Sequence, residues 1–449
     1  MTTAHDIAAF VDETTYSDLS ESVRKTLTRH VLDAVGVAIA TDLEGDSQPV
    51  FETVDELEAG GPCTVWGRST QSSPTGAAMH NGTLVRELEY ADAFLAPGET
   101  AHPSDCLAPI VAAGEYADRS GADLLTGLAI AYEIQGELAW NAPVREKGYD
   151  HVTHTIVAAT AGTAKLLGLG REQIRHALAI AVTGHTALRA TRAGAITEWN
   201  SVASANAARN AVYAVFLAKN GMYGPSDVID GQHGWKDVIT GPFELEFTPG
   251  ERVHDVTNRR YVAEANAQSA VEGIVELATA EDLDPSTVTQ IRLETFASAR
   301  RTIGGGEGSR YDIETRTQAV HSLPYVLAVA LVDRDLSLPQ YDPDRIRRSD
   351  VQTLLERVEV TEDPALTERF EAGEMPAVID VTTEDGTTYR VEKDTFHGHP
   401  SDPLEWDDLE RKFDAITGEH LTAERRDDLV ATIRSLEDHD VSELCSLLS

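Results

Sequence analysis

The spacing of apolar residues changes twice along the 449-residue chain, and these changes limit the folds that it can adopt. Up to about residue 250, apolar side chains recur every three or four positions, as in amphipathic helices, and a period of two is nearly absent. Between Leu19 and Ala40, for example, Val23, Leu27 and Val31 keep this helical spacing. The first half therefore predicts an all-helical bundle, whose many Ala and Gly residues let the helices pack closely.

Several further segments of this half can be assigned from the same pattern. Helices are expected at residues 106–117, 122–139, 155–169, 171–188 and 201–219. The last of them should end at Asn220-Gly221, because Gly is common just past the end of a helix. Residues 51–75 are rich in Gly, Pro, Ser and Thr, and this composition predicts a long surface loop.

The character of the sequence changes after Pro249. Thr287–Phe296 alternates between apolar and polar residues, as a strand does. Two further strand-like runs, Ala377–Thr383 and Thr387–Lys393, flank Glu384-Asp385-Gly386, which is a strong hairpin signal. Helices at 315–332 and 349–357, a strand at 358–360 and a helical stretch from about 405 to 448 complete the pattern.

The order helical, mixed, helical predicts a mainly α fold with two domains. We expect a large all-helical domain built from residues 1–256 plus 397–449, with an inserted smaller α+β lid domain at 257–396. In this arrangement the C-terminal helices pack back on the first domain.

The charge of the chain is strongly negative. Its 75 Asp and Glu against 37 Lys and Arg give a formal charge of −38, which repels nucleic acid and anionic membranes. Only seven residues are Lys. This composition suits a halophilic cytoplasm, where salt screens self-repulsion, although an ordinary acidic protein is the alternative. Three isolated cysteines, no secretory signal and no long apolar run indicate a soluble, cytoplasmic protein without a disulfide framework.

The stretch from Asn81 to Asp105 has the strongest functional pattern. Its first part predicts a helix with Leu84 and Leu88 on one side and Arg86 and Asp92 on the other, ended by Pro97-Gly98. The following His102-Pro103-Ser104-Asp105 leads into another helix, and Ser104 and Asp105 suit its N-cap. A helix start favours a bound carboxylate because free N–H groups point outward there. The alternative is a capped helix start with a solvated histidine.

Other polar residues gather near predicted helix ends and loops. They are His151, His154, Arg192, Asn200, Arg259, His321 and Tyr325. Arg pairs hold carboxylates bidentately and His can move a proton, so the set suits a small polycarboxylate. Alternatively, the Arg residues are simple ion-pair partners and His321 is a packed or capping residue. His151-x-x-His154 has no evident third ligand for zinc.

Several segments of the chain resemble the MmgE/PrpD family. They are Asn81–Asp105, Asp150-His151, AKLLGL at 164–169, ANAARNAV at 205–212, GMYGPSDV at 221–228 and TRTQAVHSLPYVLAVALVD at 315–333. The resemblance implies the two-domain fold predicted above, a homodimer, and a site without a metal or organic cofactor.

The same resemblance suggests roles for individual residues. Asp92, His102, His151 and Tyr325 match catalytic positions, and His154 could replace His151 because the loop length varies. His102 and His151 are the expected acid–base pair. The expected substrate-binding residues are Arg86, Ser104, Asp105, Arg192, Asn200, Arg259 and His321. Family members commonly have Lys at the positions of Asn200 and Arg259, and only Arg259 keeps the positive charge.

The implied function is that of a cofactor-independent lyase acting on a small polycarboxylate. Elimination of water, as from 2-methylcitrate in propionate catabolism, is the first expectation. The family also includes cis-aconitate decarboxylase and iminodisuccinate epimerase, so decarboxylation and epimerisation remain alternatives. A non-catalytic protein that binds a metabolite in the same cleft is the rival from another class.

Overall fold

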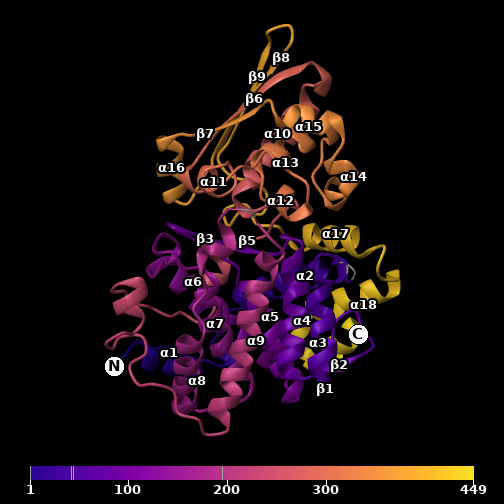
Figure 1. The fold of residues 1–449 in the computed structure, drawn as a ribbon. Coiled ribbons are helices and arrows are strands. Elements are labelled where there is room, and N and C mark those ends of the chain that lie inside the picture. The colour runs from indigo at the N-terminus through magenta and orange to yellow at the C-terminus, as the bar shows by residue number, and fades with distance from the viewer. Residues whose placement is uncertain (1, 42, 44, 195) are drawn as a thin grey trace. The chain divides into compact units, whose positions relative to one another are not determined.

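The computed structural model describes residues 2–41, 43, 45–194 and 196–449, which form two compact units (Figure 1). Unit 1 consists of Met1–Thr191, Glu198–Asn258 and Glu405–Ser449, and unit 2 of Arg192–Thr197 and Arg259–Leu404. The sequence-based boundaries were 256/257 and 396/397. In the described part of the chain, no helix is both long and apolar enough to cross a membrane.

Unit 1 is built mainly of helices. They are α1 (Thr3–Glu13), α2 (Glu21–Ala40), α3 (Gln48–Glu58), α4 (Pro74–Glu87), α5 (Leu107–Tyr116), α6 (Gly121–Asn141), α7 (Val152–Leu166), α8 (Arg171–Gly184), α9 (Trp199–Lys219), α17 (Trp406–Thr417), α18 (Ala423–Arg434) and α19 (Val441–Leu448). Small residues let them approach closely, as expected. A Cβ added to Gly162 of α7 would lie only 2.8 Å from the carbonyl oxygen of Gly127 on α6.

The C-terminal helices pack on the first helices of unit 1. Helix α17 lies beside α2, where Gly36 leaves room for the ring of Phe413. The ammonium of Lys412 on α17 is 2.6 Å from a carboxylate oxygen of Asp33 on α2. A buried ion pair therefore ties the end of the chain to its beginning.

Two expectations for the first half were wrong in detail. Helix α4 ends at Glu87 and Glu89 adopts a left-handed φ of 51°, so Asp92 is not on a helix. Pro97-Gly98 instead joins two short strands, β3 (Ala93–Ala96) and β4 (Glu99–Ala101). Strand β5 (Val256–Thr257) pairs with the other edge of β3, and this distant partner stabilises a hairpin that is too short to stand alone.

The expected surface loop at 51–75 is also largely ordered. Its first residues belong to α3, which buries Phe51 and Val54. The rest forms β1 (Ala59–Thr64) and β2 (Gln71–Ser72), which pair antiparallel. Unit 1 is therefore mainly helical, rather than all-helical as predicted.

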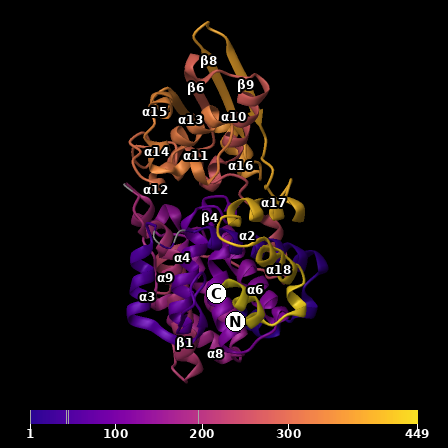
Figure 2. The same cartoon turned by 90° about the vertical axis from the view of Figure 1, so that its right-hand side faces the viewer.

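Unit 2 is an α+β unit around one four-stranded sheet (Figure 2). The strands β6 (Val288–Thr295), β7 (Val358–Glu362), β8 (Ala377–Thr383) and β9 (Thr388–Lys393) lie in the order β7-β6-β8-β9, with β6 and β7 parallel. The strand and hairpin predictions are confirmed. Helix α10 (Gln268–Ala280) packs against β8 and β9, and α13 (Leu323–Asp333) against β7. The other helices are α11 (Ala297–Thr302), α12 (Arg316–Val320), α14 (Pro343–Ile346), α15 (Ser349–Leu355) and α16 (Pro364–Glu371).

The helix expected at 315–332 is divided into α12 and α13. The division falls at His321-Ser322, where the Ser322 hydroxyl accepts the N–H of Tyr325 at 3.0 Å and caps α13. Ser followed by Pro324 at the second helical position is a helix-start signal that the apolar pattern of the segment hides.

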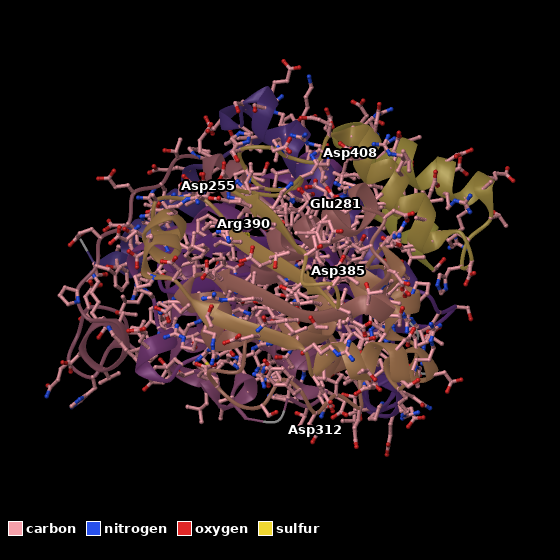
Figure 3. All side chains as sticks on the ribbon, turned by 90° about the horizontal axis from the view of Figure 1, so that it is seen from above. Asp255, Glu281, Asp312, Asp385, Arg390 and Asp408 are labelled. Carbon is pink, nitrogen blue, oxygen red and sulfur yellow. The ribbon has the colours of Figure 1, made fainter. Side chains whose placement is uncertain are left out.

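Acidic side chains are spread over both units. Of those labelled in Figure 3, Asp255 and Asp408 belong to unit 1, and Glu281, Asp312 and Asp385 to unit 2. Acidic side chains therefore contribute to both units.

Candidate active site

Unit 1 brings two of the predicted catalytic histidines together. His102 follows β4, and His151 occupies the N-cap position of α7. Their ring centroids are 5.0 Å apart with the planes at 71°, and the residues are only 5% and 7% exposed. Residues 49 positions apart in the sequence thus present two imidazoles to one small volume.

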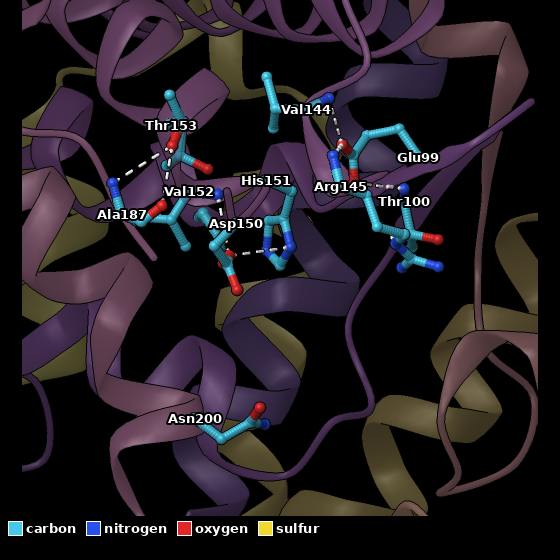
Figure 4. A network of polar contacts seen from close by, with 12 residues as sticks. Glu99, Thr100, Val144, Arg145, Asp150, His151, Val152, Thr153, Ala187 and Asn200 are labelled. Carbon is cyan, nitrogen blue, oxygen red and sulfur yellow. Dashed lines mark hydrogen bonds and ion pairs between the residues drawn. The ribbon is translucent and has the colours of Figure 1, made fainter. Parts of the chain in front are cut away.

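Each ring is oriented by a neighbouring oxygen. His102 Nδ1 lies 2.9 Å from the main-chain carbonyl of Asp92. Because a carbonyl oxygen can only accept a hydrogen bond, Nδ1 carries the hydrogen. Nε2 is therefore the basic atom of the neutral ring. His151 Nδ1 is 3.2 Å from a carboxylate oxygen of Asp150, which also accepts the N–H of Val152 (Figure 4). The role of Asp150 was missed, although the Asp-His dipeptide is visible in the sequence.

The carboxylate of Asp92 is held from two sides. Its Oδ1 accepts the backbone N–H of Ser104 at 3.1 Å, and its Oδ2 accepts the hydroxyl of Tyr132 at 2.8 Å. Ser104 therefore contributes its backbone N–H here. The N-cap position of α5 is occupied by Cys106 without a side-chain cap bond, so the expectation that Ser104 or Asp105 caps this helix was wrong.

A buried polar chain continues behind Asp92. His30 Nδ1 is 3.9 Å from Asp92 Oδ2 and 3.2 Å from the amide nitrogen of Asn258, which donates to Asp33 at 3.0 Å. Asp33 in turn binds Lys412. Burial lowers the pKa of His30, and the charges of Asp92 and Asp33 offset part of that effect.

The same environment keeps the hydroxyl of Tyr132 protonated. Burial raises the pKa of Tyr132 well above its usual value, and the neighbouring charge of Asp92 raises it further. Tyr132 can therefore act as a hydrogen-bond donor to Asp92 at any working pH. Sequence reasoning did not single out Tyr132, His30 or Lys412.

Arg86 lies in a second buried cluster. Its Nη1 donates to Glu89 at 2.6 Å, and its Nε is 3.7 Å from Asp105. Burial by itself lowers the pKa of Arg86, but the carboxylates of Glu89 and Asp105 raise it above its usual value, so the group stays cationic. The side-chain nitrogen of Asn200 donates to the other oxygen of Glu89 at 3.1 Å. Arg86, Asp105 and Asn200 are thus joined through Glu89.

Another cation lies on the loop that precedes His151. Arg145 is buried, and its Nε is 3.8 Å from Glu99 (Figure 4). Glu99 also accepts the backbone N–H groups of Val144 and Arg145, both at 3.0 Å. These contacts fix the loop between α6 and α7, and sequence reasoning did not identify them.

His154 has a different environment from His151. It is fully buried, its Nε2 donates to the carbonyl of Ala142 at 2.9 Å, and its ring packs against Trp235. Burial lowers the pKa of His154. Of the two alternatives left open by the sequence, His151 is the one that faces His102.

Four predicted site residues belong to unit 2. Arg259 and Tyr325 are fully buried, and the hydroxyl of Tyr325 donates to the carbonyl of Gln340. His321 Nδ1 donates to the carbonyl of Thr317 at 2.8 Å, and Arg192 is half-buried. Their part in substrate binding or catalysis stays a prediction. Among the described residues, no group of three or more His, Cys, Asp or Glu side chains is placed to hold a metal ion.

Comparisons with known proteins agree with the motifs of the sequence. A model of the MmgE/PrpD N-terminal domain matches residues 5–248, and one of the C-terminal domain matches residues 261–438. Cis-aconitate decarboxylase of Mus musculus is 27% identical over an alignment covering 96% of this chain and 90% of that protein. The 2-methylcitrate dehydratase of Cupriavidus necator is 30% identical, and that of Escherichia coli K12 is 28% identical. Each of these two alignments covers 72% of this chain and 70% of the dehydratase. The chain therefore belongs to the MmgE/PrpD family.

Proposed function

We propose that this protein is a cofactor-independent lyase that eliminates water from a small polycarboxylate of the 2-methylcitrate type. The observation that carries the proposal is the pair of imidazoles of His102 and His151, 5.0 Å apart and each oriented by an oxygen at Nδ1. Membership of a family that includes 2-methylcitrate dehydratases supports the same substrate class.

The two rings supply the proton transfers of an elimination. His102 Nε2 takes the proton from the carbon next to a carboxylate, and the electron pair of that C–H bond forms the new double bond. His151, protonated and held by Asp150, gives its proton to the leaving hydroxyl, which departs as water. Histidine suits both roles because its unperturbed pKa of about 6.5 lies near working pH.

Cations stabilise the charge that develops on the substrate carboxylate. Each preorganised donor is typically worth about 3 kcal/mol in such a step. Arg86 is buried and cationic, and Arg145 lies on the same loop as His151. Asn200 offers a neutral donor where the family resemblance leads us to expect a lysine. In our proposal Arg86 and Arg145 supply the positive charge of unit 1, and the carboxylates of Glu89, Asp105 and Glu99 offset part of it.

Decarboxylation is the second candidate, and one observation favours it. The alignment with the mouse cis-aconitate decarboxylase spans more of this chain than the alignments with the dehydratases do. In that reaction the carbanion forms by loss of carbon dioxide, and a histidine then gives a proton to the carbon.

A single assay separates these reactions. 2-Methylcitrate, citrate, cis-aconitate and iminodisuccinate are incubated with the protein at high salt in heavy water and followed by NMR. Water elimination gives an olefinic product, decarboxylation releases carbon dioxide, and epimerisation exchanges deuterium without either. Turnover that survives dialysis against a chelator supports the cofactor-independent assignment. Absence of any turnover favours the non-catalytic alternative.

The role of His102 has its own test. His102→Asn should leave folding intact and lower kcat by about 10²- to 10⁴-fold, the range for losing one positioned proton-transfer group. The matched control is His233→Asn, which changes an exposed histidine with a left-handed backbone that Asn tolerates. A wild-type rate for His102→Asn would remove His102 from the mechanism.

A further inference from the structure

Unit 2 contains a cavity of about 310 Å³ that the proposed mechanism does not use. It lies between the glycine-rich loop that ends at Gly308 and the short helix α12, and Gly194 closes another side. The polar side chains that line it include Arg310, Gln318 and His321.

In the part of the chain that the structure describes, the buried guanidinium of Arg310 is bound only by neutral groups. The residue is 5% exposed; its Nε and Nη2 donate to the carbonyl of Thr302 at 3.2 and 3.0 Å. Its Nη1 donates to the carbonyls of Gly194 and Ser309 at 3.4 and 3.3 Å. Among the described residues, no carboxylate forms an ion pair with Arg310.

The surrounding charges compensate this cation poorly. Burial lowers the pKa of Arg310, and the charge of Glu307 offsets only part of the effect. Glu307 is itself engaged by Arg301 at 3.8 Å. Asp312 also lines the cavity, but it is exposed to solvent, which screens its charge. A buried charge is costly unless an opposite charge approaches it, so an anion in the cavity would be stabilised.

The other polar groups of the cavity also suit an anion. The side-chain oxygen of Gln318 accepts the N–H groups of Glu314 and Thr315 at 2.9 and 3.2 Å, which leaves its NH₂ group as the donor for a ligand. Gly308 has a φ of +135°, and a Cβ there would lie 3.5 Å from Nη1 of Arg310. A side chain at this position would be strained by the positive φ and would contact the guanidinium.

We propose that this cavity is a carboxylate-binding site in which Arg310 supplies the counter-charge and Gln318 a hydrogen bond. The contacts with Thr302, Gly194 and Ser309 engage four of the five N–H groups of Arg310, so the remaining N–H on Nη2 can donate to one oxygen of a carboxylate. The charge of the guanidinium strengthens this hydrogen bond. The carboxylate belongs either to the substrate of the proposed lyase or to a separate small carboxylate, and both sources need the same chemistry. Binding does not depend on catalysis.

Calorimetric titration with tricarballylate, a tricarboxylate without a hydroxyl group to eliminate, tests the proposal. Arg310→Gln should weaken binding by about 10- to 100-fold, the loss expected for hydrogen bonds to a charged group. The matched control is Arg357→Gln, because Arg357 also donates to a backbone carbonyl, that of Val288, but does not line the cavity. Undiminished binding to Arg310→Gln, equal weakening in both variants, or no binding to the wild type would overturn the proposal.

A second pair of variants keeps the test valid if Arg310→Gln fails to fold. Ser309 is exposed at the cavity beside Arg310. Ser309→Asp should place a carboxylate against the guanidinium, raise Tm and weaken tricarballylate binding about 10-fold, whereas Ser309→Asn should do neither. Equal behaviour of the two variants would contradict the proposal.

Inhibition kinetics identify the source of the carboxylate. If tricarballylate competes with the substrate, and this competition is lost in Arg310→Gln, the site binds the substrate. If the inhibition is non-competitive, the site binds a separate small carboxylate. If no substrate is turned over, the proposed function fails, but the calorimetric result still decides the binding site.

Discussion

Glu133 gives the stability of unit 1 a pH dependence whose size follows from its surroundings. Its side chain on α6 is 2% exposed, and the backbone N–H groups of Thr248 and Arg252 donate to its two oxygens at 2.8 and 3.0 Å. Burial raises the pKa of Glu133 from 4.5 to about 7, although these two N–H groups lower it. The folded state therefore binds a proton that the unfolded state has already released.

The sign and the magnitude follow from proton linkage. A carboxyl group with a raised folded-state pKa contributes stability that is present below about pH 4.5 and is lost as pH rises through about 7. The loss is about 1.4 kcal/mol per pH unit, or about 3 kcal/mol over the whole window. Glu133→Gln removes the titration, so the free energy of unfolding of the wild type should fall by that amount relative to the variant across this window.

Urea unfolding from pH 4.5 to 8 at constant salt, followed by circular dichroism, measures this difference. In the Glu133→Gln variant, the amide NH₂ replaces one carboxylate oxygen and faces a backbone N–H, so two donors meet. This contact lowers the free energy of unfolding by about 1–3 kcal/mol at every pH. Glu133→Met is the control, because it has a different constant cost and must show the same pH dependence. Parallel curves for the wild type and both variants would refute the reasoning.

Three further predictions concern the site and the surface. His30→Gln should lower kcat about 10-fold with KM unchanged, because the ring of His30 lies beside that of Tyr132, whose hydroxyl donates to Asp92; a change confined to KM would contradict this role. Asn200→Lys should lower KM for tricarboxylates, whereas Asn200→Gln should not; equal KM values would show that the missing cation does not limit binding. Tm should rise from low to molar salt because screening relieves the charge of −38, and a flat salt series would contradict salt adaptation.

The helical and strand periods of the sequence predicted most elements, because each amphipathic segment of this chain keeps its own apolar face. The hairpin of β3 and β4 could not be found this way. It depends on Glu89 leaving the helical conformation and on pairing with β5, whose Thr257 lies 164 residues after its partner Ala93. A local pattern contains neither piece of information, and the apolar residues before Pro97 fit a helix equally well.

The candidate site shows the same limit. His102 and His151 were predicted because they lie in motifs, but their partners were not. Tyr132 sits among the apolar residues of α6, and Lys412 lies near the end of the chain. Each is unremarkable by itself, and only the folded chain shows that both belong to the polar chain around Asp92.

The environment of Asn200 shows how a neutral amide fits a position where the family resemblance leads us to expect a lysine. Glu89 accepts from both Arg86 and Asn200, so a neutral amide completes the coordination of a carboxylate that Arg86 already neutralises. A lysine at this position would add a second cation beside Glu89. With Asp105 near Arg86, the present group has two carboxylates and one cation, and a lysine would balance the charge. A substrate carboxylate is therefore attracted less strongly here than it would be by a lysine. We expect the protein to prefer substrates whose other carboxylates bind to cations outside this group.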